Sequence, residues 1–564
     1  MLVENPVLTG FNADPSIIRV GKDYYIATST FEWFPGVQIH HSGDLAHWEL
    51  LTQPLTGVDL RGIPSSGGIW APCLSWYDGT FYLVYTIVRS YRGMYKDTHN
   101  YLVTAKDIMG PWSEPVYLQS MGFDPSLFHD EDGRKWLLSM RSGFGFCQDE
   151  FNGIVIQEYS EKEKKLVGKP QLIFRGTELG ITEGPHIYKK DGWYYLMTAE
   201  GGTEFTHAVT LARSRSLTGP YETAPHNPIL TSWEKPLLKL QKAGHASLVE
   251  TPEGRWYLAH LASRPVSVQQ MCILGRETSL QEVIWEDDWL KLSDGSNSPS
   301  DYFEITDDPA GENTDCEFPD CNNQEKSKNL YRLYEDFEHD VWNLHLQSLR
   351  CPLGKRASLK EHPGWLRLYG GESPESCFEQ SLLAHRQKHF YSETTVKMIF
   401  QPSSYGEMAG LIYYYDDLSY YYFYLTKNEK EQDVLQLLSC VMGRHTWPLG
   451  HGILLRSPED SETAENRNAE VGMKMSCESE GSLTLWLRLK TEKELAHFYY
   501  SLNGEEFQRI EPALDAIVLS DDYYYKFDQY RFTGAFIGIC CQDLALHKAY
   551  ADFDFFDYRE IEPE

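Results

Sequence analysis

The sequence predicts an all-β protein, built as a five-bladed β-propeller followed by a C-terminal β-sandwich of the jelly-roll kind. Three observations support this prediction. A short hairpin pattern recurs five times in the first half of the chain, the second half is rich in strand patterns without that repeat, and helical periodicity is not sustained anywhere along the 564 residues. A chain of this length is too long for a single core, so two or three domains are expected.

Each copy of the repeated pattern consists of a strand, a tight turn and a return strand rich in aromatic residues, which is typical of a β-hairpin. In the first copy, Asp14-Pro15-Ser16-Ile17 is followed by Gly21-Lys22-Asp23 and then by Tyr24-Tyr25-Ile26. The five copies begin at Asp14, Ala71, Asp124, Gly184 and His245, so successive starts lie 57, 53, 60 and 61 residues apart. That spacing accommodates one four-stranded sheet per copy, and radial repetition of such sheets gives a propeller.

The domain organisation follows from where the repeat ends. We predict a propeller over residues 1–300, a linker or surface excursion over 301–330 that is rich in polar residues, and a β-sandwich over 331–564. In the sandwich, the leucines at 483, 485, 487 and 489 alternate with polar or aromatic residues, which indicates a half-buried strand. The Tyr- and Ile-rich stretch 411–425 suggests a strand covered on both faces, and Asn503-Gly504 suggests a hairpin with a type I′ turn.

Composition excludes some classes of partner. The net charge of −31 and the pI near 5.0 argue against nucleic acid, because phosphate backbones are bound by clustered Lys and Arg. No apolar run approaches the ~18 residues that a membrane span needs, and no signal peptide is visible. The 11 cysteines are scattered and odd in number, which favours a cytoplasmic location with free thiols.

The first residues of the five copies suggest a site. In a propeller the corresponding ends of the innermost strands surround the central axis, so Asp14, Asp124 and His245 should converge there, with Glu183 beside Gly184. Asp14 and Asp124 both precede Pro-Ser, so the acidic residue has a purely structural interpretation as a repeated strand start. The other three copies lack the Asp, however, so the fold does not need it. Paired carboxylates across a pocket are the minimum for glycoside hydrolysis.

Several segments resemble one family in detail. They are Asn-Ala-Asp-Pro-Ser at 12–16, Ala-Thr-Ser-Thr-Phe-Glu-Trp-Phe-Pro-Gly-Val at 27–37, Gly-Ile-Trp-Ala-Pro at 68–72, Phe-Asp at 123–124, Thr-Glu-Gly-Pro-His at 182–186 and Leu-Gly-Arg-Glu-Thr at 274–278. Further matches lie at 380–387 and 532–536. Together they resemble the β-xylosidases of glycoside hydrolase family 43 over nearly the whole chain. The resemblance implies a five-bladed propeller with a C-terminal β-sandwich and an inverting mechanism.

By match of motif, Asp14 would be the general base that activates water and Glu183 the general acid. Asp124 would orient Glu183 and raise its pKa through like-charge repulsion. Inversion would require Asp14 and Glu183 to lie about 6.5–9.5 Å apart, with room for the attacking water.

Substrate-binding residues also follow from the resemblance. Arg276 would contact sugar hydroxyls, or else form a structural ion pair, and Phe31, Trp33 and Trp70 would wall the pocket or belong to the core. Phe532 would approach the pocket rim from the sandwich, leaving a blind pocket suited to exo cleavage. His245 would contact the site, face a hydrated Ca²⁺ near the axis, or be structural. No other cofactor is expected.

The expected reaction is the release of D-xylose from xylobiose and short xylo-oligosaccharides by a β-1,4-xylosidase. α-L-Arabinofuranosidase activity, alone or in addition, is the alternative on the same scaffold, and a non-catalytic sugar-binding propeller is a remote one. The resemblance also implies a homo-oligomer, either a dimer or a tetramer.

Overall fold

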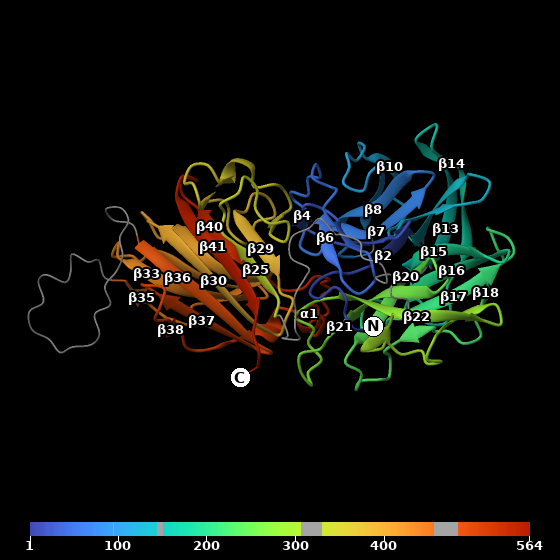
Figure 1. Cartoon of the computed structure of the whole chain (residues 1–564). Coiled ribbons are helices and arrows are strands. Elements are labelled where there is room, and N and C mark those ends of the chain that lie inside the picture. Colours follow the sequence, from blue (N-terminus) through green and yellow to red (C-terminus); the bar gives the residue numbers. More distant parts are fainter. Residues whose placement is uncertain (94, 144–149, 306–329, 456–482, 564) are drawn as a thin grey trace, which may run out of the picture. The chain divides into compact units, whose positions relative to one another are not determined.

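The computed structural model describes residues 1–93, 95–143, 150–305, 330–455 and 483–563 (Figure 1). The chain folds into two compact units. Residues 1–265 and 275–314 form the first unit, and residues 266–274 and 315–564 form the second. Most of the predicted linker, residues 306–329, lies outside the described residues. In the described residues, no helix is long and apolar enough to cross a membrane.

The first unit is a propeller of five antiparallel sheets, coloured blue to green in Figure 1. The first sheet holds β2 (Ser16–Val20), β3 (Asp23–Thr28), β5 (Gln38–Ser42) and β6 (Glu49–Thr52). The second holds β7 (Gly68–Tyr77), β8 (Thr80–Ser90), β9 (Asp97–Ala105) and β10 (Val116–Gln119). The third holds β11 (Ser126–His129), β12 (Lys135–Ser142), β13 (Phe151–Ser160) and β14 (Lys165–Phe174).

The remaining two sheets complete the ring. The fourth holds β15 (Glu183–Lys190), β16 (Trp193–Glu200), β17 (Ala208–Ser214), β18 (Glu222–Thr223) and the short β19 (Leu230–Thr231). The fifth holds β20 (Gln241–Glu250), β21 (Trp256–Ser263), β22 (Glu277–Glu286) and β23 (Trp289–Leu292). Outside the five blades, β1 (Leu2–Glu4) pairs with β24 (Tyr302–Glu304), and β4 (Trp33–Phe34) occurs in the chain after β3 and before β5. Each predicted repeat is the inner hairpin of one sheet, which confirms the five-bladed architecture.

Serines on the inner strands join neighbouring blades. Ser247 of the fifth blade donates its hydroxyl to the carbonyl of Pro15 at 2.8 Å and accepts the backbone N–H of Ile17 at 2.9 Å. Ser16 of the first blade accepts the N–H of Leu74 in the second at 3.0 Å. Among the described strands, none is shared between the first and last sheets, and the hydroxyl of Ser247 is one of the groups that join these two blades.

The second unit is a β-sandwich, coloured yellow to red in Figure 1. One sheet has the order β27 (Ala357–Ser358), β28 (Leu366–Tyr369), β41 (Tyr550–Glu560), β30 (Tyr391–Phe400), β36 (Leu483–Glu492), β37 (Leu495–Ser501) and β38 (Gln508–Arg509). In that sheet β25 (Arg332–Glu335) also pairs with β41, and β39 (Leu514–Asp515) with β37.

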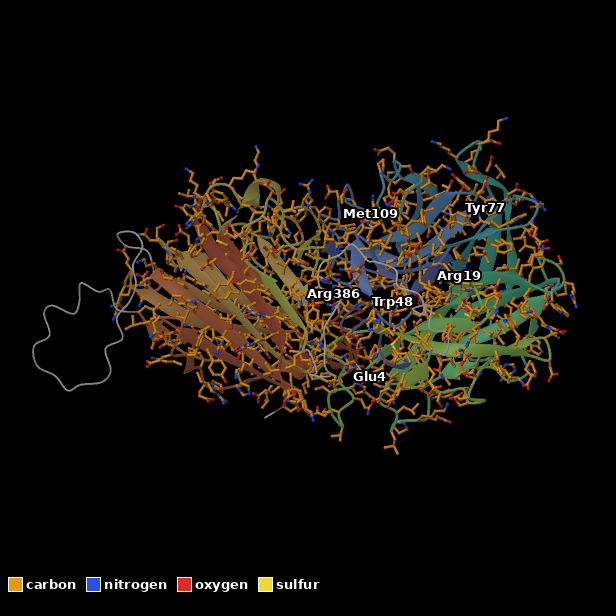
Figure 2. All side chains as sticks on the ribbon, in the orientation of Figure 1. Glu4, Arg19, Trp48, Tyr77, Met109 and Arg386 are labelled. Carbon is orange, nitrogen blue, oxygen red and sulfur yellow. The ribbon has the colours of Figure 1, made fainter. Side chains whose placement is uncertain are left out.

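The other sheet has the order β34 (Arg444–Thr446), β33 (Asp433–Val441), β32 (Ser419–Lys427), β31 (Glu407–Asp416), β40 (Phe536–Asp543), β29 (Leu382–Arg386) and β26 (Gln347–Leu349), and β35 (Ile453–Leu454) also pairs with β33. The helical elements are η2 (Gly354–Arg356), η4 (Ala516–Val518) and α1 (Asp521–Tyr525). Side chains from both sheets, such as Leu411 and Leu487, form one apolar core. Figure 2 shows the side chains of both units, with Trp48 labelled in the propeller and Arg386 in the sandwich.

The structure confirms one local prediction for the sandwich and corrects two. Leu485, Leu487 and Leu489 of β36 are fully buried, as the alternation predicted. The stretch 411–425 is buried on both faces but forms two strands, β31 and β32, rather than one. The type I′ turn is wrong: only Gly504 of the pair has a positive φ, at 78°, and the side chain of Asn503 accepts the N–H groups of residues 505 and 506 in a longer loop.

Candidate active site

The five repeat starts share an unusual backbone conformation. The φ angles are 55° at Asp14, 32° at Ala71, 52° at Asp124, 56° at Gly184 and 40° at His245. Side-chain-bearing residues avoid this left-handed region, and proteins hold such strained positions mostly where function uses them. The strand pairing also shifts register at the second, fourth and fifth positions, and such bulges re-aim side chains. The backbone therefore departs from regular β-strand geometry at the same point in every blade.

Asp14 is held by three partners from different parts of the propeller. The Ser29 hydroxyl donates to Oδ2 at 2.6 Å, and Nη1 of Arg276 donates to Oδ1 at 3.1 Å. Nδ1 of His245 lies 3.5 Å from the same Oδ1. Each carboxylate oxygen has a second lone pair, so Asp14 can still accept a hydrogen bond from water.

Asp124 and Glu183 belong to neighbouring blades and are both nearly buried, with 7% and 6% of their surface exposed. Glu183 is the first residue of β15, and the backbone N–H of the next residue, Gly184, donates to Oδ2 of Asp124 at 3.1 Å. Asp124 therefore fixes the start of the strand that carries Glu183.

The electrostatics differ among the three carboxyl groups. Burial would raise the pKa of Asp14, but the charges of Arg276 and His245 and the hydrogen bond from Ser29 outweigh it, so the pKa lies below 3.8. Burial first, and then the negative charge of Asp14, raise the pKa of Glu183 to about 8. Near neutral pH, Asp14 is thus ionised and Glu183 protonated.

The pKa of Asp124 is also raised well above 3.8, by burial first and then by the charges of Glu183 and Asp14. We expected Asp124 to raise the pKa of Glu183 by repulsion, whereas burial and Asp14 are the main causes of the Glu183 shift. Repulsion is mutual, however, so Asp124 and Glu183 titrate as a pair and share a proton more readily than they both ionise.

His245 completes the group around the axis. Its ring lies so close to Gly184 that a Cβ atom there would be 3.0 Å from Nε2. The hydrated Ca²⁺ ion that the family resemblance implied near His245 stays a prediction, with water expected to supply most of its oxygen ligands. The carboxylate beside His245, that of Asp14, is bound to the guanidinium of Arg276. We assign no step of the reaction to a metal.

Aromatic rings lie beside this group. The rings of Phe31 and Trp70 lie 5.6 Å apart, and the guanidinium of Arg276 lies 5.5 Å from the centre of the Phe31 ring. Phe31 has a φ of 54°, so it shares the left-handed backbone of the repeat starts. Trp33 is fully buried in β4, and Phe532 is half-buried in the second unit. The sugar-binding roles of these four aromatic residues stay predictions.

Two neighbours of the carboxylates, Ser29 and Lys96, were not predicted from the sequence. Ser29 was predictable, because β2 and β3 pair Ser16 with Ala27, and continuing that register places Ser29 opposite Asp14. Lys96, whose positive charge partly offsets the raised pKa of Glu183, comes from the segment between β8 and β9. No pattern in the sequence marks Lys96, since no repeat or spacing relates it to Glu183.

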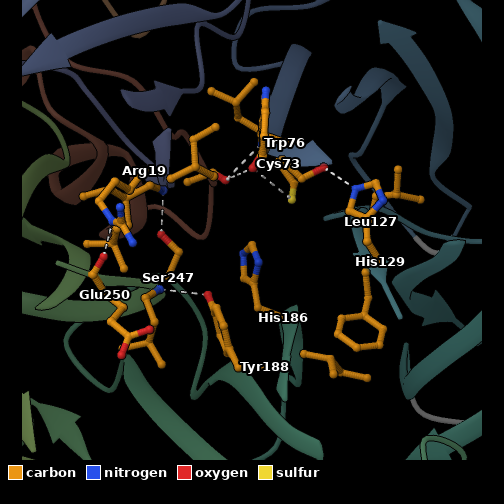
Figure 3. Close-up of a pocket in the computed structure, with 18 of the residues that line it drawn as sticks. Arg19, Cys73, Trp76, Leu127, His129, His186, Tyr188, Ser247 and Glu250 are labelled. Atoms are coloured by element: carbon orange, nitrogen blue, oxygen red, sulfur yellow. Dashed lines mark hydrogen bonds between the residues drawn. The ribbon is translucent and has the colours of Figure 1, made fainter. Parts of the chain in front are cut away.

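A cavity lies further along the propeller axis. It has a volume of about 430 Å³ and is lined by residues that follow the repeat starts on all five inner strands. Figure 3 shows some of them, including Cys73, Leu127, His186 and Ser247, and Arg19 and Tyr77 also lie on its wall. The carboxylate group is not part of this wall, because the cavity begins two positions after Asp14, at Ser16.

Two protein families match the chain. Residues 3–290 match Glycosyl hydrolases family 43, and residues 334–559 match the Beta xylosidase C-terminal Concanavalin A-like domain. The first match covers the propeller and the second covers the sandwich.

Individual proteins are similar over almost the full length. A Beta-xylosidase of Bacillus subtilis is 44% identical, covering 99% of this chain and 100% of the relative. Xylosidase/arabinosidase 43B of Humicola insolens is 45% identical, covering 99% of this chain and 98% of the relative. The crystal structure of a xylan beta-1,4-xylosidase from Bacillus Halodurans superposes with a TM-score of 0.88 at 46% identity, covering 99% of this chain and 100% of the other.

Proposed function

The chain belongs to family 43 of the glycosyl hydrolases, and we propose that it is an inverting, exo-acting β-1,4-xylosidase that releases D-xylose from xylobiose and short xylo-oligosaccharides. One observation is central to the proposal: within a single buried group, the pKa of Asp14 is lowered and that of Glu183 is raised to about 8. Opposed shifts of this kind assign a base and an acid to two carboxyl groups that are otherwise alike.

In the proposed mechanism, ionised Asp14 accepts a proton from water as that water attacks the anomeric carbon. Arg276 and Ser29 keep Asp14 ionised and fix the plane of its carboxylate. Protonated Glu183 donates its proton to the glycosidic oxygen as the bond from that oxygen to C1 breaks. Because water attacks C1 from the opposite face, xylose is released with inverted configuration.

Asp124 has a positioning role in this proposal. Its hydrogen bond from the Gly184 N–H holds the beginning of β15, and burial, followed by the charges of Glu183 and Asp14, raises its own pKa well above the ordinary value. Phe31 and Trp70 would pack against the apolar C–H face of the sugar ring.

A second activity has one supporting observation. The Humicola insolens relative, 45% identical over almost all of its length, is described as a xylosidase/arabinosidase. We therefore propose that α-L-arabinofuranosides are accepted as secondary substrates. The cytoplasmic location and the homo-oligomer stay predictions.

Proton NMR at early times of xylobiose hydrolysis tests the proposal, because the α and β anomers of xylose give separate signals before mutarotation mixes them. We expect α-xylose first, and faster hydrolysis of xylobiose than of an aryl α-L-arabinofuranoside. β-Xylose as the first product would contradict the role of Asp14 as base. Cleavage of the arabinofuranoside alone would leave the site intact but refute the named substrate.

A further inference from the structure

Away from the carboxylate site, one group of side chains in the described part of the sandwich combines three kinds of metal-binding atom. A carboxylate oxygen of Glu375, Sγ of Cys440 and a ring nitrogen of His445 all lie within 4.8 Å of one another. We propose that Glu375, Cys440 and His445 bind a zinc ion, with water as the fourth ligand. This site is separate from the proposed xylosidase reaction.

The strand register builds most of the site. β33 and β34 form a hairpin in which Cys440 lies directly opposite His445, with Gly443 in the turn at a φ of 75°. Directly opposed residues of an antiparallel pair project their side chains from the same face of the sheet. On the other side of β33, Tyr420 of β32 lies opposite Cys440, so Tyr420, Cys440 and His445 form one row across three strands.

Glu375 reaches this row from the segment between β28 and β29. The hydroxyl of Tyr420 donates to Oε1 of Glu375 at 2.9 Å, and Nε2 of His445 contacts the same oxygen. The tyrosine therefore orients the carboxylate toward Cys440 and His445. An outer hydrogen bond of this kind is the usual support for a metal-binding carboxylate.

The donor set suits zinc. Zinc binds thiolate at about 2.3 Å and imidazole or carboxylate at about 2.0–2.2 Å, so tetrahedral ligand atoms lie about 3.3–3.8 Å apart. The present separations, within 4.8 Å, need only small side-chain movements to reach that range. Hard cations such as Ca²⁺ and Mg²⁺ prefer oxygen alone, which excludes them from a site with sulfur and nitrogen donors.

Charge and protons balance on binding. On binding, the Cys440 thiol loses its proton to solvent, His445 binds through the Nε2 lone pair with its proton on Nδ1, and Glu375 binds through a carboxylate oxygen. Two negative ligands then neutralise the doubly charged ion. His445 and Glu375 are 35% and 41% exposed, so the ion has a path from solvent to the buried sulfur.

The thiol of Cys440 donates to the carbonyl of Leu418 at 3.2 Å. A bound divalent ion would replace that proton, since its charge stabilises the thiolate.

Cobalt(II) is the probe for the test, because a thiolate ligand gives tetrahedral Co²⁺ an intense near-ultraviolet charge-transfer band that oxygen and nitrogen ligands do not give. Titration of the full chain, purified with chelator, is expected to develop this band with one Co²⁺ per chain, and Zn²⁺ is expected to displace it. Cys440→Ser should abolish the band, and His445→Ala should weaken binding at least tenfold.

Two variants serve as matched controls. Cys377→Ser removes a thiol two residues from Glu375 that lies outside the group, and His451→Ala removes an exposed histidine of the same unit. Both should leave the band and the affinity unchanged. The proposal is refuted if the native chain gives no thiolate band, or if the band persists in Cys440→Ser. Should Cys440→Ser fail to fold, His445→Ala decides, because unchanged cobalt affinity in that surface variant also refutes the site.

Discussion

Replacing Ser29 by alanine tests how Asp14 is kept ionised. The Ser29 hydroxyl donates to Oδ2 of Asp14 at 2.6 Å and also accepts the backbone N–H of Ala71 at 2.8 Å. A hydrogen bond to a charged group contributes a net ~1.5–3 kcal/mol. Because one pKa unit corresponds to about 1.36 kcal/mol, losing this bond should raise the pKa of Asp14 by about 1–2 units.

The assay is the pH dependence of kcat/KM on xylobiose. In the proposed mechanism, activity requires ionised Asp14 and protonated Glu183. The acidic limb should therefore report the pKa of Asp14 and the alkaline limb that of the Asp124–Glu183 pair, with the pKa of Glu183 at about 8. In Ser29→Ala the acidic limb should move upward by about 1–2 units, while the alkaline limb stays in place. Xylobiose is the right substrate because its leaving group needs the proton of Glu183.

The same substitution should lower the free energy of unfolding at neutral pH. The pKa of Asp14 is lowered by folding, so its contribution to stability is present above the unfolded pKa and is lost as the pH falls through the folded value. Ser29→Ala reduces that contribution. The matched control is Ser16→Ala, which also removes an acceptor from a backbone N–H, that of Leu74 at 3.0 Å, and leaves the Ser29–Asp14 bond in place. An unmoved acidic limb in Ser29→Ala, or the same shift in Ser16→Ala, would refute the reasoning.

Three further predictions concern the acid, the strand start and the sandwich. Glu183→Gln should lower kcat on xylobiose by ~10²–10⁴-fold and remove the alkaline limb of the pH profile. The kcat on an aryl xyloside with an acidic phenol should fall far less, because that leaving group needs no proton. Equal losses of kcat on both substrates would contradict the acid role. Gly184→Ala should lower both activity and melting temperature, since φ is 56° and the new Cβ would lie 3.0 Å from Nε2 of His245. Gly192→Ala, where φ is 74° and the neighbour is the end of a flexible arginine, should affect stability alone. Arg531→Met should cost ~3–5 kcal/mol in denaturant unfolding, because it leaves Asp416 buried without its ion-pair partner at 2.7 Å. The exposed pair of Arg509 with Glu511 provides the comparison, and Arg509→Met should cost less than ~1 kcal/mol.

The architecture was predictable because each repeat copy has recognisable turn residues and because the copies are nearly evenly spaced along the chain. Turn residues such as Asp78-Gly79 and Asp191-Gly192 mark each inner hairpin, and both glycines have the positive φ that a tight turn needs. The even spacing then fixed the number of blades. The prediction of a type I′ turn at Asn503-Gly504 was wrong because the side chain of Asn503 accepts hydrogen bonds from two following N–H groups. Local hydrogen bonds of that kind override the preference of the Asn-Gly dipeptide for a type I′ turn.

The site was partly predictable for a similar reason. Asp14, Asp124 and His245 are each the first residue of a repeat copy, so the propeller fold predicts that they converge at the axis. Glu183 directly precedes the fourth repeat start, so its position followed in the same way. Arg276 was predicted from the family resemblance, and Lys96 from neither. A segment between two strands can bring a charge to the axis without any periodic pattern, and only the folded structure shows which one does.

Ser247 joins the last blade to the first, and the packing of blades around the ring affects the distance between the proposed base and acid. Asp14, Asp124 and Glu183 belong to the first, third and fourth blades, so no single strand sets the gap between the proposed base and acid. That gap is the sum of several blade-to-blade offsets around the ring, and a small loosening at any one of them changes it. An inverting hydrolase must keep that gap wide enough for one water molecule and no wider. The hydroxyl of Ser247 is bound to both Pro15 and Ile17, so it helps to keep the distance between Asp14 and Glu183 within the narrow range that the proposed reaction requires.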